Sequence, residues 1–132
     1  MITVLDVSGA VEILFQRKKE ALFRDAFDNA AWVIAPGLYI AEISNVFWKY
    51  QKTGVISHEE CMQMTTDGIE MIDDYFDCLD LWKEALGEGI REAHSVYDMY
   101  YLVLTRRNDA TLITNDDRLA RLCNSLKIAV CH

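Results

Sequence analysis

Hydrophobic residues in this chain form short continuous runs that alternate with longer stretches in which apolar residues recur every three or four positions. Short β-branched runs are typical of buried strands, and the longer periodic stretches are typical of amphipathic helices. The sequence therefore predicts strands at residues 2–5, 32–35, 75–79, 111–114 and 128–131. It predicts helices at residues 11–27, 38–52, 57–72, 81–92, 95–107 and 117–126.

Local signals mark several boundaries of these elements. The basic cluster at residues 17–19 predicts a break inside the first helical stretch, and residues 36–37, a Pro-Gly pair, end the second strand. Gly54 is a typical helix C-terminus. Ser57, with Glu60 three residues later, matches a capping box and predicts the start of a helix.

The alternation of strands and helices determines the predicted fold class. It favours an α/β domain whose mostly parallel sheet is covered by helices on both faces. The 132 residues fit a single domain spanning residues 1–132. In sheets of this kind, ligands bind beyond the carboxyl ends of the strands. Polar residues that directly follow a strand are therefore the first candidates for a site.

Hydropathy and charge narrow the functional class. No apolar run reaches the ~20 residues of a membrane span, and the N-terminus lacks the basic region of a signal peptide, so we expect a cytoplasmic protein with no membrane partner. The formal net charge is −8. This charge counts against a tight, metal-independent binder of nucleic acid. It counts less against a nuclease in which a bound cation offsets acidic ligands.

Four acidic residues, far apart in the chain, occupy positions that such a fold brings together. Asp6 and Asp116 each come just after a predicted strand, and Glu42 and Asp98 lie in predicted helices. Clustered carboxylates repel one another unless a hard cation such as Mg²⁺ or Mn²⁺ neutralises them. The pattern therefore predicts a divalent-metal site.

Helix capping is the competing explanation for three of these acids. Asp6 can cap the helix that follows it, and Ser95 with Asp98 matches a capping box. Asp116 and Asp117 both stand at a helix start, where acids complement the helix dipole. Of that pair, we expect Asp117 to be the cap, with a role as an auxiliary metal ligand as its alternative.

Glu42 has a different alternative. It shares one face of its predicted helix with Asn45 and Lys49. Such a stripe is typical of a solvated surface, but it can also point into a cleft. In the second case, Asn45 would be a further hydrogen-bonding group beside the carboxylates.

Taken in order, four segments resemble the acidic motifs of the PIN domain, and more narrowly those of the VapC-type toxins of prokaryotic toxin–antitoxin pairs. They are residues 4–8, 41–45, 97–102 and 110–119. The similarity spans essentially the whole chain, and the last segment, a strand followed by a Thr-x-Asp turn, carries it most strongly. Residues 62–85 match the family only in helical character.

This resemblance implies a three-layer α/β/α sandwich with a parallel central sheet. It also implies a ribonuclease that uses Mg²⁺ or Mn²⁺, with RNA as its substrate. A homodimer and a small antitoxin protein that occludes the site are further implications.

We predict metal-assisted hydrolysis of an RNA phosphodiester bond. The expected ligands of one or two cations are Asp6, Asp98 and Asp116. Glu42 is a further ligand or a base that orients water. The polar residues expected to support these carboxylates are Ser8, Asn45, Thr114 and Asp117. The basic residues expected to contact RNA phosphates are Lys49, Lys52, Arg106, Arg107 and Arg118.

Two other functions compete with this one. A catalytically weak PIN-like scaffold would act as a protein or RNA interaction module, and the tryptophans and methionines of the chain would supply its partner surface. A phosphoacceptor receiver domain also gathers acids around Mg²⁺ at strand ends, but it usually pairs acids early in the chain and places a Lys after a late strand. Here Asp6 has no acidic neighbour, and Thr114 leads to Asn115 and Asp116.

Overall fold

A five-stranded sheet forms the middle layer of the molecule. In the computed structural model, which describes residues 1–132, the strands are β1 (Ile2–Leu5), β2 (Trp32–Pro36), β3 (Asp74–Phe76), β4 (Thr111–Ile113) and β5 (Val130–Cys131). Their order across the sheet is β3-β2-β1-β4-β5, and every neighbouring pair is parallel. β1 therefore lies at the centre, where Val4 and Leu5 are fully buried.

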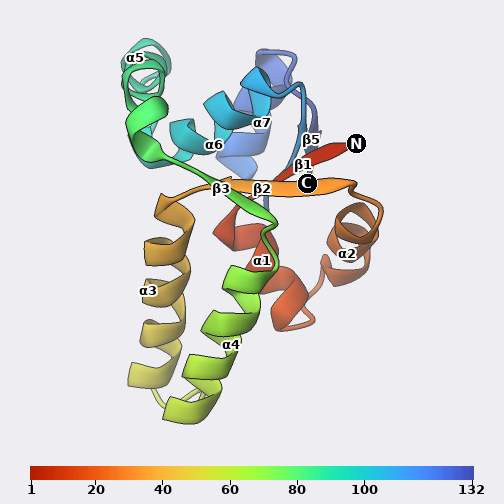
Figure 1. Ribbon diagram of the computed structural model, residues 1–132, viewed down its shortest axis with the longest axis vertical. Coiled ribbons are helices and arrows are strands. Elements are labelled where there is room, and N and C mark those ends of the chain that lie inside the picture. Colours follow the sequence, from red (N-terminus) through yellow and green to blue (C-terminus); the bar gives the residue numbers. More distant parts are fainter.

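Helices cover both faces of this sheet. One layer contains α1 (Val7–Leu14), α2 (Glu20–Asp28), α3 (Leu38–Lys52) and α4 (His58–Glu70). The other contains the short 3₁₀ turn η1 (Cys78–Asp80), α5 (Trp82–Glu92), α6 (Val96–Arg107) and α7 (Asp117–Ser125). Figure 1 shows the layers below and above the sheet, and the predicted α/β/α sandwich is confirmed. None of these helices combines the length and apolar character needed to cross a membrane.

The strand order excludes one predicted function and locates the candidate site. A receiver domain has the strand order 2-1-3-4-5, which differs from the order found here. In this sheet the order reverses between β1 and β4, and ligands of open α/β sheets bind at that reversal, outside the carboxyl ends of the strands. Asp6 directly follows β1, and Asp116 comes shortly after β4.

The first helix begins earlier than predicted. α1 starts at Val7 rather than at residue 11, because the Asp6 side chain caps it. The cap is the hydrogen bond that Gly9 N donates to Asp6 Oδ1 at 2.9 Å. Asp6 is therefore the helix cap that the sequence offers as one alternative. Its position at the carboxyl edge of the sheet also suits a ligand in a pocket at that edge.

The break predicted at residues 17–19 is confirmed, and its geometry is specific. Gln16 adopts φ 51, in the left-handed region of backbone space. Its amide donates to Ile13 O at 3.2 Å, and the Arg17 amide donates to Glu12 O at 2.9 Å. This pair of bonds is a Schellman motif, which ends α1 and holds the backbone of Arg17 against the helix end.

The third strand is shorter than predicted. β3 covers Asp74–Phe76 instead of residues 75–79. Leu79 N donates to the Asp77 side chain at 2.8 Å, and this contact starts the turn η1. Such local bonding by an Asp side chain competes with strand pairing, so the chain leaves the sheet.

α6 is the helix that ties the core together. It contacts β1, β2 and β4. Met99, Leu102 and Val103 on this helix are fully buried. Because burial of these apolar side chains drives folding, α6 has a firmly determined position on the sheet. That position carries the two neighbouring polar residues Asp98 and Tyr101 to the sheet edge.

Gly9 is a point of very close approach between α1 and the sheet. A Cβ added there would lie 3.0 Å from the backbone oxygen of Ile113 and 3.1 Å from Leu5 Cδ1. A backbone carbonyl paired in a sheet cannot easily move away. Gly9→Ala is therefore expected to lower the free energy of unfolding by about 1–3 kcal/mol, measured by urea denaturation.

Gly87→Ala is the matched control for this substitution. Gly87 lies inside α5, and a Cβ added there meets no atom within 4 Å. Alanine is the better helix former, so this variant should gain up to about 1 kcal/mol of stability. Equal losses at both positions would show that crowding at Gly9 is not the cause.

Candidate active site

One pocket of about 370 Å³ lies at the reversal of the strand order. It is lined by all four predicted acids: Asp6 after β1, Glu42 from α3, Asp98 from α6 and Asp116 after β4. Residues separated by most of the chain therefore meet in one cavity.

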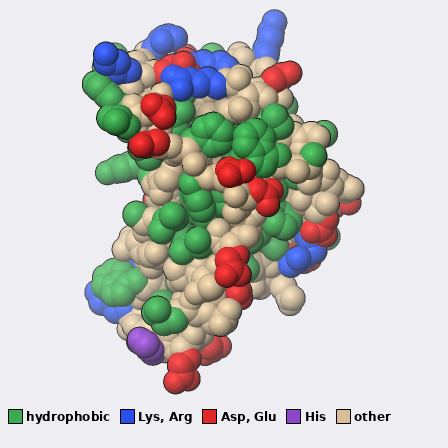
Figure 2. All heavy atoms as spheres, in the orientation of Figure 1, with side chains coloured by type: hydrophobic (Ala, Val, Ile, Leu, Met, Phe, Trp, Pro, Cys, Tyr) green, Lys and Arg blue, Asp and Glu red, His purple; other side chains and the backbone are tan.

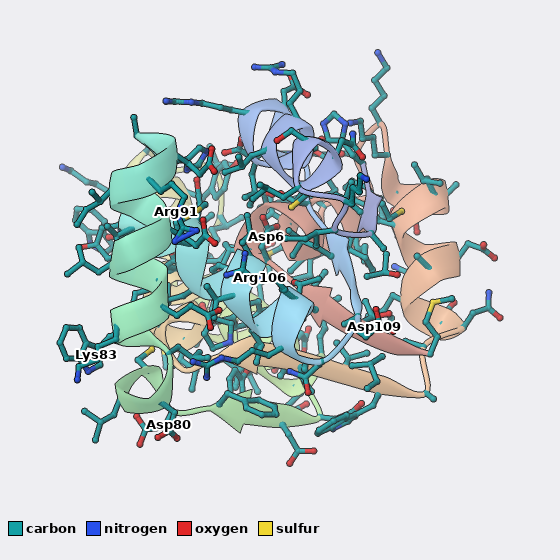
Figure 3. All side chains as sticks on the ribbon, turned by 90° about the horizontal axis from the view of Figure 1, so that it is seen from above. Asp6, Asp80, Lys83, Arg91, Arg106 and Asp109 are labelled. Carbon is teal, nitrogen blue, oxygen red and sulfur yellow. The ribbon has the colours of Figure 1, made fainter.

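Asp6 is buried at the base of this pocket. Its carboxylate accepts hydrogen bonds from Ser8 Oγ at 2.7 Å, from Gly9 N at 2.9 Å and from Thr114 Oγ1. Burial raises the pKa of Asp6 from 3.8 to about 6, against the lowering by these hydrogen bonds, and the charge of Asp98 adds to the rise. Figure 3 shows Asp6 well inside the molecule, whereas Asp80 and Lys83 lie at its rim.

Ser8 and Thr114 join the two strand ends into one hydrogen-bonded unit. Their hydroxyl oxygens lie 3.3 Å apart. Asn115 N donates to Ser8 Oγ at 2.8 Å, and Asp116 N donates to Thr114 Oγ1 at 3.1 Å. Both hydroxyls thus contact Asp6 and the turn after β4, while their part in catalysis stays a prediction.

Glu42 is half-buried on α3 and faces the same pocket. Tyr101 OH donates to Glu42 Oε1 at 2.6 Å. Burial raises the pKa of Glu42 from 4.5 to about 7; the Tyr101 hydrogen bond lowers it, and the charges of Asp6 and Asp98 raise it further. A proton therefore binds to Glu42 near neutral pH when no cation is present.

Asp98 does not form the capping box with Ser95 that its spacing allows. Ser95 makes no side-chain hydrogen bond at the start of α6, so the capping box does not form. Instead, His94 Nδ1 lies 3.6 Å from Asp98 Oδ2. Burial raises the pKa of Asp98 and the charge of Asp116 raises it further, whereas His94 and Arg118 lower it. Arg118, one of the basic residues expected to contact RNA, therefore lowers the pKa of an acid in the pocket.

Asp116, not Asp117, is the cap of α7. Leu119 N donates to Asp116 Oδ1 at 2.9 Å. Asp117 is exposed, outside the pocket lining, and its Oδ1 lies 2.7 Å from Nε2 of His132. The predicted cap was one residue too late, because both acids have cap chemistry and only the backbone distinguishes them. Asp116 thus combines the cap with a place in the pocket.

The polar stripe on α3 enters the pocket only at Glu42. Asn45, Lys49 and Lys52 are exposed and lie outside the pocket lining. Lys52 Nζ lies 5.1 Å from the ring centroid of Trp48, a cation–π contact near the end of this 15-residue helix. No contact supports the predicted role of Asn45 beside the carboxylates, because Asn45 is exposed and Val46 is the residue of the next turn of α3 that lines the pocket.

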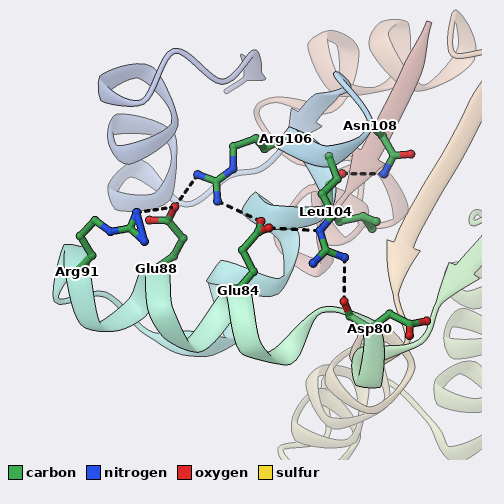
Figure 4. A network of polar contacts seen from close by, with 8 residues as sticks. Asp80, Glu84, Glu88, Arg91, Leu104, Arg106 and Asn108 are labelled. Carbon is green, nitrogen blue, oxygen red and sulfur yellow. Dashed lines mark hydrogen bonds and ion pairs between the residues drawn. The ribbon is translucent and has the colours of Figure 1, made fainter.

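Arg106 and Arg107 belong to a separate network between α5 and α6 (Figure 4). Arg106 donates to Glu88 Oε1 at 2.5 Å and to Glu84 Oε2 at 3.1 Å. Arg107 donates to Asp80 O at 2.8 Å. Figure 2 shows Lys and Arg side chains gathered at this end of the molecule. Arg106 neutralises the buried Glu88, and both arginines hold α5 on α6. These contacts account for the positions of both side chains without RNA.

Four further residues bring polar groups to the pocket that the sequence did not single out: Glu12, Arg17, Tyr101 and Asn115. Glu12 is buried on α1, and Asn115 Nδ2 donates to its Oε1 at 3.2 Å. A lone acid inside an apolar helix was the available signal for Glu12. Tyr101 follows Asp98 by one helical turn, which was a second signal. For Arg17, the sequence indicates only a place in the helix break at residues 17–19.

The donor chemistry of the pocket suits a hard divalent cation. Carboxylates are the ligands that Mg²⁺ and Mn²⁺ prefer. A positive ion would relieve the unfavourable burial of charge that raises the pKa of Asp6, Glu42 and Asp98. No three His, Cys, Asp or Glu side chains surround a point closely enough to enclose an ion. Because Mg²⁺ keeps several waters and is held through one or two carboxylates, the pocket fits a partly hydrated ion.

The pattern that describes the PIN domain matches residues 3–124. This chain belongs to the PIN domain family. The family that the four acidic segments resemble is therefore confirmed. Ribonuclease VapC3 from Pyrobaculum aerophilum is a relative of this PIN domain, 23% identical over 123 residues that cover 89% of this chain and 91% of that protein.

Solved structures share the fold of this PIN domain. PAE2754 from Pyrobaculum aerophilum superposes with a TM-score of 0.75 at 15% identity, over 98% of this chain and 83% of that one. VapC20 from Mycobacterium tuberculosis, a toxin that cleaves the sarcin–ricin loop, gives 0.67 at 11%, over 91% and 94%. VapBC2 from Rickettsia felis, bound to a DNA fragment from its promoter, gives 0.67 at 16%, over 98% and 97%.

The raised pKa of Asp6 predicts how stability depends on pH. Because the folded pKa is about 6 and the ordinary value is 3.8, the folded state binds the proton more tightly. This contribution to stability is full below about pH 4 and is lost as the pH rises through about 6. Asp6→Asn removes the buried charge, so without metal it should stabilise the protein at pH 8 by about 3 kcal/mol at most.

Thermal or urea unfolding of both proteins between pH 4 and pH 8 tests this expectation. The gain from Asp6→Asn should shrink towards zero as the pH falls. Asp28→Asn, an exposed acid at the end of α2, is the control and should show no such trend. A difference between wild type and Asp6→Asn that is constant with pH would contradict the assignment.

Proposed function

We propose that this protein is an endoribonuclease of the VapC type that hydrolyses RNA phosphodiester bonds with Mg²⁺ or Mn²⁺. The observation that carries the proposal is the convergence of Asp6, Glu42, Asp98 and Asp116 on one pocket from four separate elements. Three of these carboxyls have raised pKa values, so the arrangement is unfavourable without a counter-charge. Such perturbed groups gather at functional sites.

The residues that would hold the cation, directly or through its bound waters, are Asp6, Asp98 and Asp116, with Glu42 beside them. When bound, the cation lowers the pKa of a coordinated water and offsets the charge that develops on the phosphate. Ser8 and Thr114 hold the Asp6 carboxylate in a fixed orientation through hydrogen bonds to its two oxygens. A carboxylate fixed in this way loses little further freedom when it becomes a ligand.

Glu42 is the proposed proton acceptor. Its Oε1 is occupied by the Tyr101 hydroxyl at 2.6 Å, which leaves Oε2 to take a proton from water. Glu42 lines the pocket beside the other acids, and a general base must lie within hydrogen-bond reach of the proton that it takes. Tyr101 thus fixes the orientation of the base.

Related proteins support an RNA substrate and an antitoxin partner. They include a ribonuclease, a toxin that cleaves the sarcin–ricin loop and a VapBC assembly. We therefore propose a small antitoxin protein as the physiological partner of this chain. The homodimer and the particular RNA target stay predictions.

A catalytically weak interaction module is the second candidate function. Its support is the exposure of large apolar side chains on the packed helices α3 and α4, where Trp48 and Met62 are 50% and 61% exposed. Exposed apolar residues of this size are a feature of partner surfaces. Retention of all four acids in one pocket favours the enzyme over this candidate.

Asp98→Asn is expected to abolish RNA cleavage without unfolding the protein. Asparagine has the same shape but cannot supply an anionic ligand, so the rate should fall by more than about 100-fold. Removal of one negative charge beside Asp116 should not lower stability. Cleavage of a labelled single-stranded RNA with Mg²⁺ or Mn²⁺ measures the rate, and circular dichroism measures the fold.

Asp28→Asn is again the control, since that exposed acid lies outside the pocket. It should cleave RNA as fast as the wild type. If Asp98→Asn did the same, the proposed site would be wrong. Loss of wild-type cleavage on adding a chelator, and its return with excess Mn²⁺, would establish the metal requirement.

Calorimetric titration with Mn²⁺ separates the enzyme from the interaction module. The enzyme requires binding of Mn²⁺ that releases protons near pH 7, because Asp6 and Glu42 hold protons there in part. The heat of binding should therefore vary with the ionisation enthalpy of the buffer. Absence of any Mn²⁺ binding would favour the module.

A further inference from the structure

Arg17 is the only basic residue among those that line the acidic pocket. We propose that its guanidinium binds an RNA phosphate adjacent to the one that is cleaved, and so positions the strand across the acids. This inference rests on the proposed ribonuclease function and goes beyond it by naming the group that recognises the substrate backbone.

The guanidinium of Arg17 is held in place by two aromatic rings. Its Cζ lies 5.0 Å from the ring centroid of Phe15 and 5.4 Å from that of Tyr50. Its Nη2 donates to Tyr50 OH at 2.6 Å. The two rings themselves meet edge to face, with centroids 4.9 Å apart. Cation–π contact on this cage fixes the plane of the guanidinium.

The backbone of Arg17 is also fixed. α1 ends at Leu14, Gln16 forms the Schellman motif that follows, and the Arg17 amide donates to Glu12 O at 2.9 Å. Tyr50 comes from α3, the helix that supplies Glu42 to the pocket. The side chain therefore links the end of α1 to α3 at the pocket, and it is preorganised before any ligand arrives.

The charge of Arg17 is not used by a carboxylate. Arg24, Arg91, Arg106 and Arg107 each lie within 4.0 Å of a glutamate, whereas Arg118 and Arg121, like Arg17, form no ion pair but lie outside the pocket lining. The hydrogen bond of Arg17 goes to a neutral hydroxyl. A guanidinium has five N–H donors, so most remain for a phosphate, which Arg can bind through two parallel bonds.

The pocket needs such a group because its other charged residues are acidic. Five of them, Asp6, Glu12, Glu42, Asp98 and Asp116, line the cavity with Arg17. A cation bound by the acids would attract the phosphate to be cut, but the neighbouring phosphates of the strand would still meet negative charge. An exposed guanidinium in the pocket lining offsets that repulsion for one of them.

RNA binding by a protein that cannot cut tests the proposal. In the Asp98→Asn background with Mg²⁺, the affinity for a fluorescein-labelled single-stranded RNA is measured by anisotropy at several salt concentrations. Adding Arg17→Ala should weaken binding about 10-fold and reduce the slope of log affinity against log salt by about 0.7. In otherwise wild-type protein, the same change should raise KM about 10-fold and leave kcat within about 2-fold.

Arg24→Ala is the matched control. Arg24 is an exposed arginine on α2 that pairs with Glu20 and lies outside the pocket, so affinity and salt slope should stay as in the parent. Arg17→Lys keeps the charge without the planar fork, and affinity between those of the parent and Arg17→Ala is expected. If Arg17→Ala fails to fold, Arg17→Lys carries the test, and parental affinity in it would overturn the proposal.

The outcomes separate this inference from the proposed function. If wild-type protein cleaves RNA and Arg17→Ala changes neither KM nor the salt slope, the role of Arg17 is only to hold the end of α1 against α3. The inference then fails while the proposed function stands. If wild-type protein cleaves no RNA with either metal, the proposed function fails. Binding of RNA that still depends on Arg17 would then support the phosphate contact by itself.

Discussion

Burial of the Asp6 carboxylate at the end of the central strand is the constraint on which the pocket depends. A charged group in that position must find its hydrogen-bond donors within the protein. It takes them from Ser8, Gly9 and Thr114. Thr114 follows β4, so Asp6 is satisfied only when β4 pairs with β1 in its native register. Pairing of β1 with β4 therefore brings the Thr114 donor to Asp6.

The same bonds compensate the charge only in part. The pKa of Asp6 stays raised, and Glu42 and Asp98 are raised with it. The fold thus holds several carboxyl groups together despite the free energy that their burial and repulsion cost. Burial of the apolar face of α6 offsets that cost. Clustering these carboxylates lowers the free energy of unfolding, and the same repulsion favours binding of protons or of a cation to the acids.

The fold was largely predictable, because apolar periodicity reflects burial and the alternation of strands with helices reflects a parallel sheet. The four acids were predictable for the same reason, since their places relative to strand ends follow from the order of elements. Contacts between distant side chains were not. Nothing local distinguishes Asp116 from Asp117 as a cap, and nothing near Arg106 reveals that Glu84 and Glu88 engage it. The place of Arg17 in the pocket was also unpredictable, because one of the two rings that hold its guanidinium belongs to Tyr50, on another helix.

The bond from Thr114 to Asp6 joins residues 108 positions apart. A ribosome that has completed residues 1–105 has made three of the four acids, yet neither β4 nor Asp116 exists. Until β4 is added, the end of β1 has no partner on that side and Asp6 lacks the hydrogen bond from Thr114. For the ribonuclease proposed here, chemistry on RNA must then wait for the last part of translation. The topology of the sheet thus means that the pocket cannot be complete until β4 and Asp116 have been synthesised.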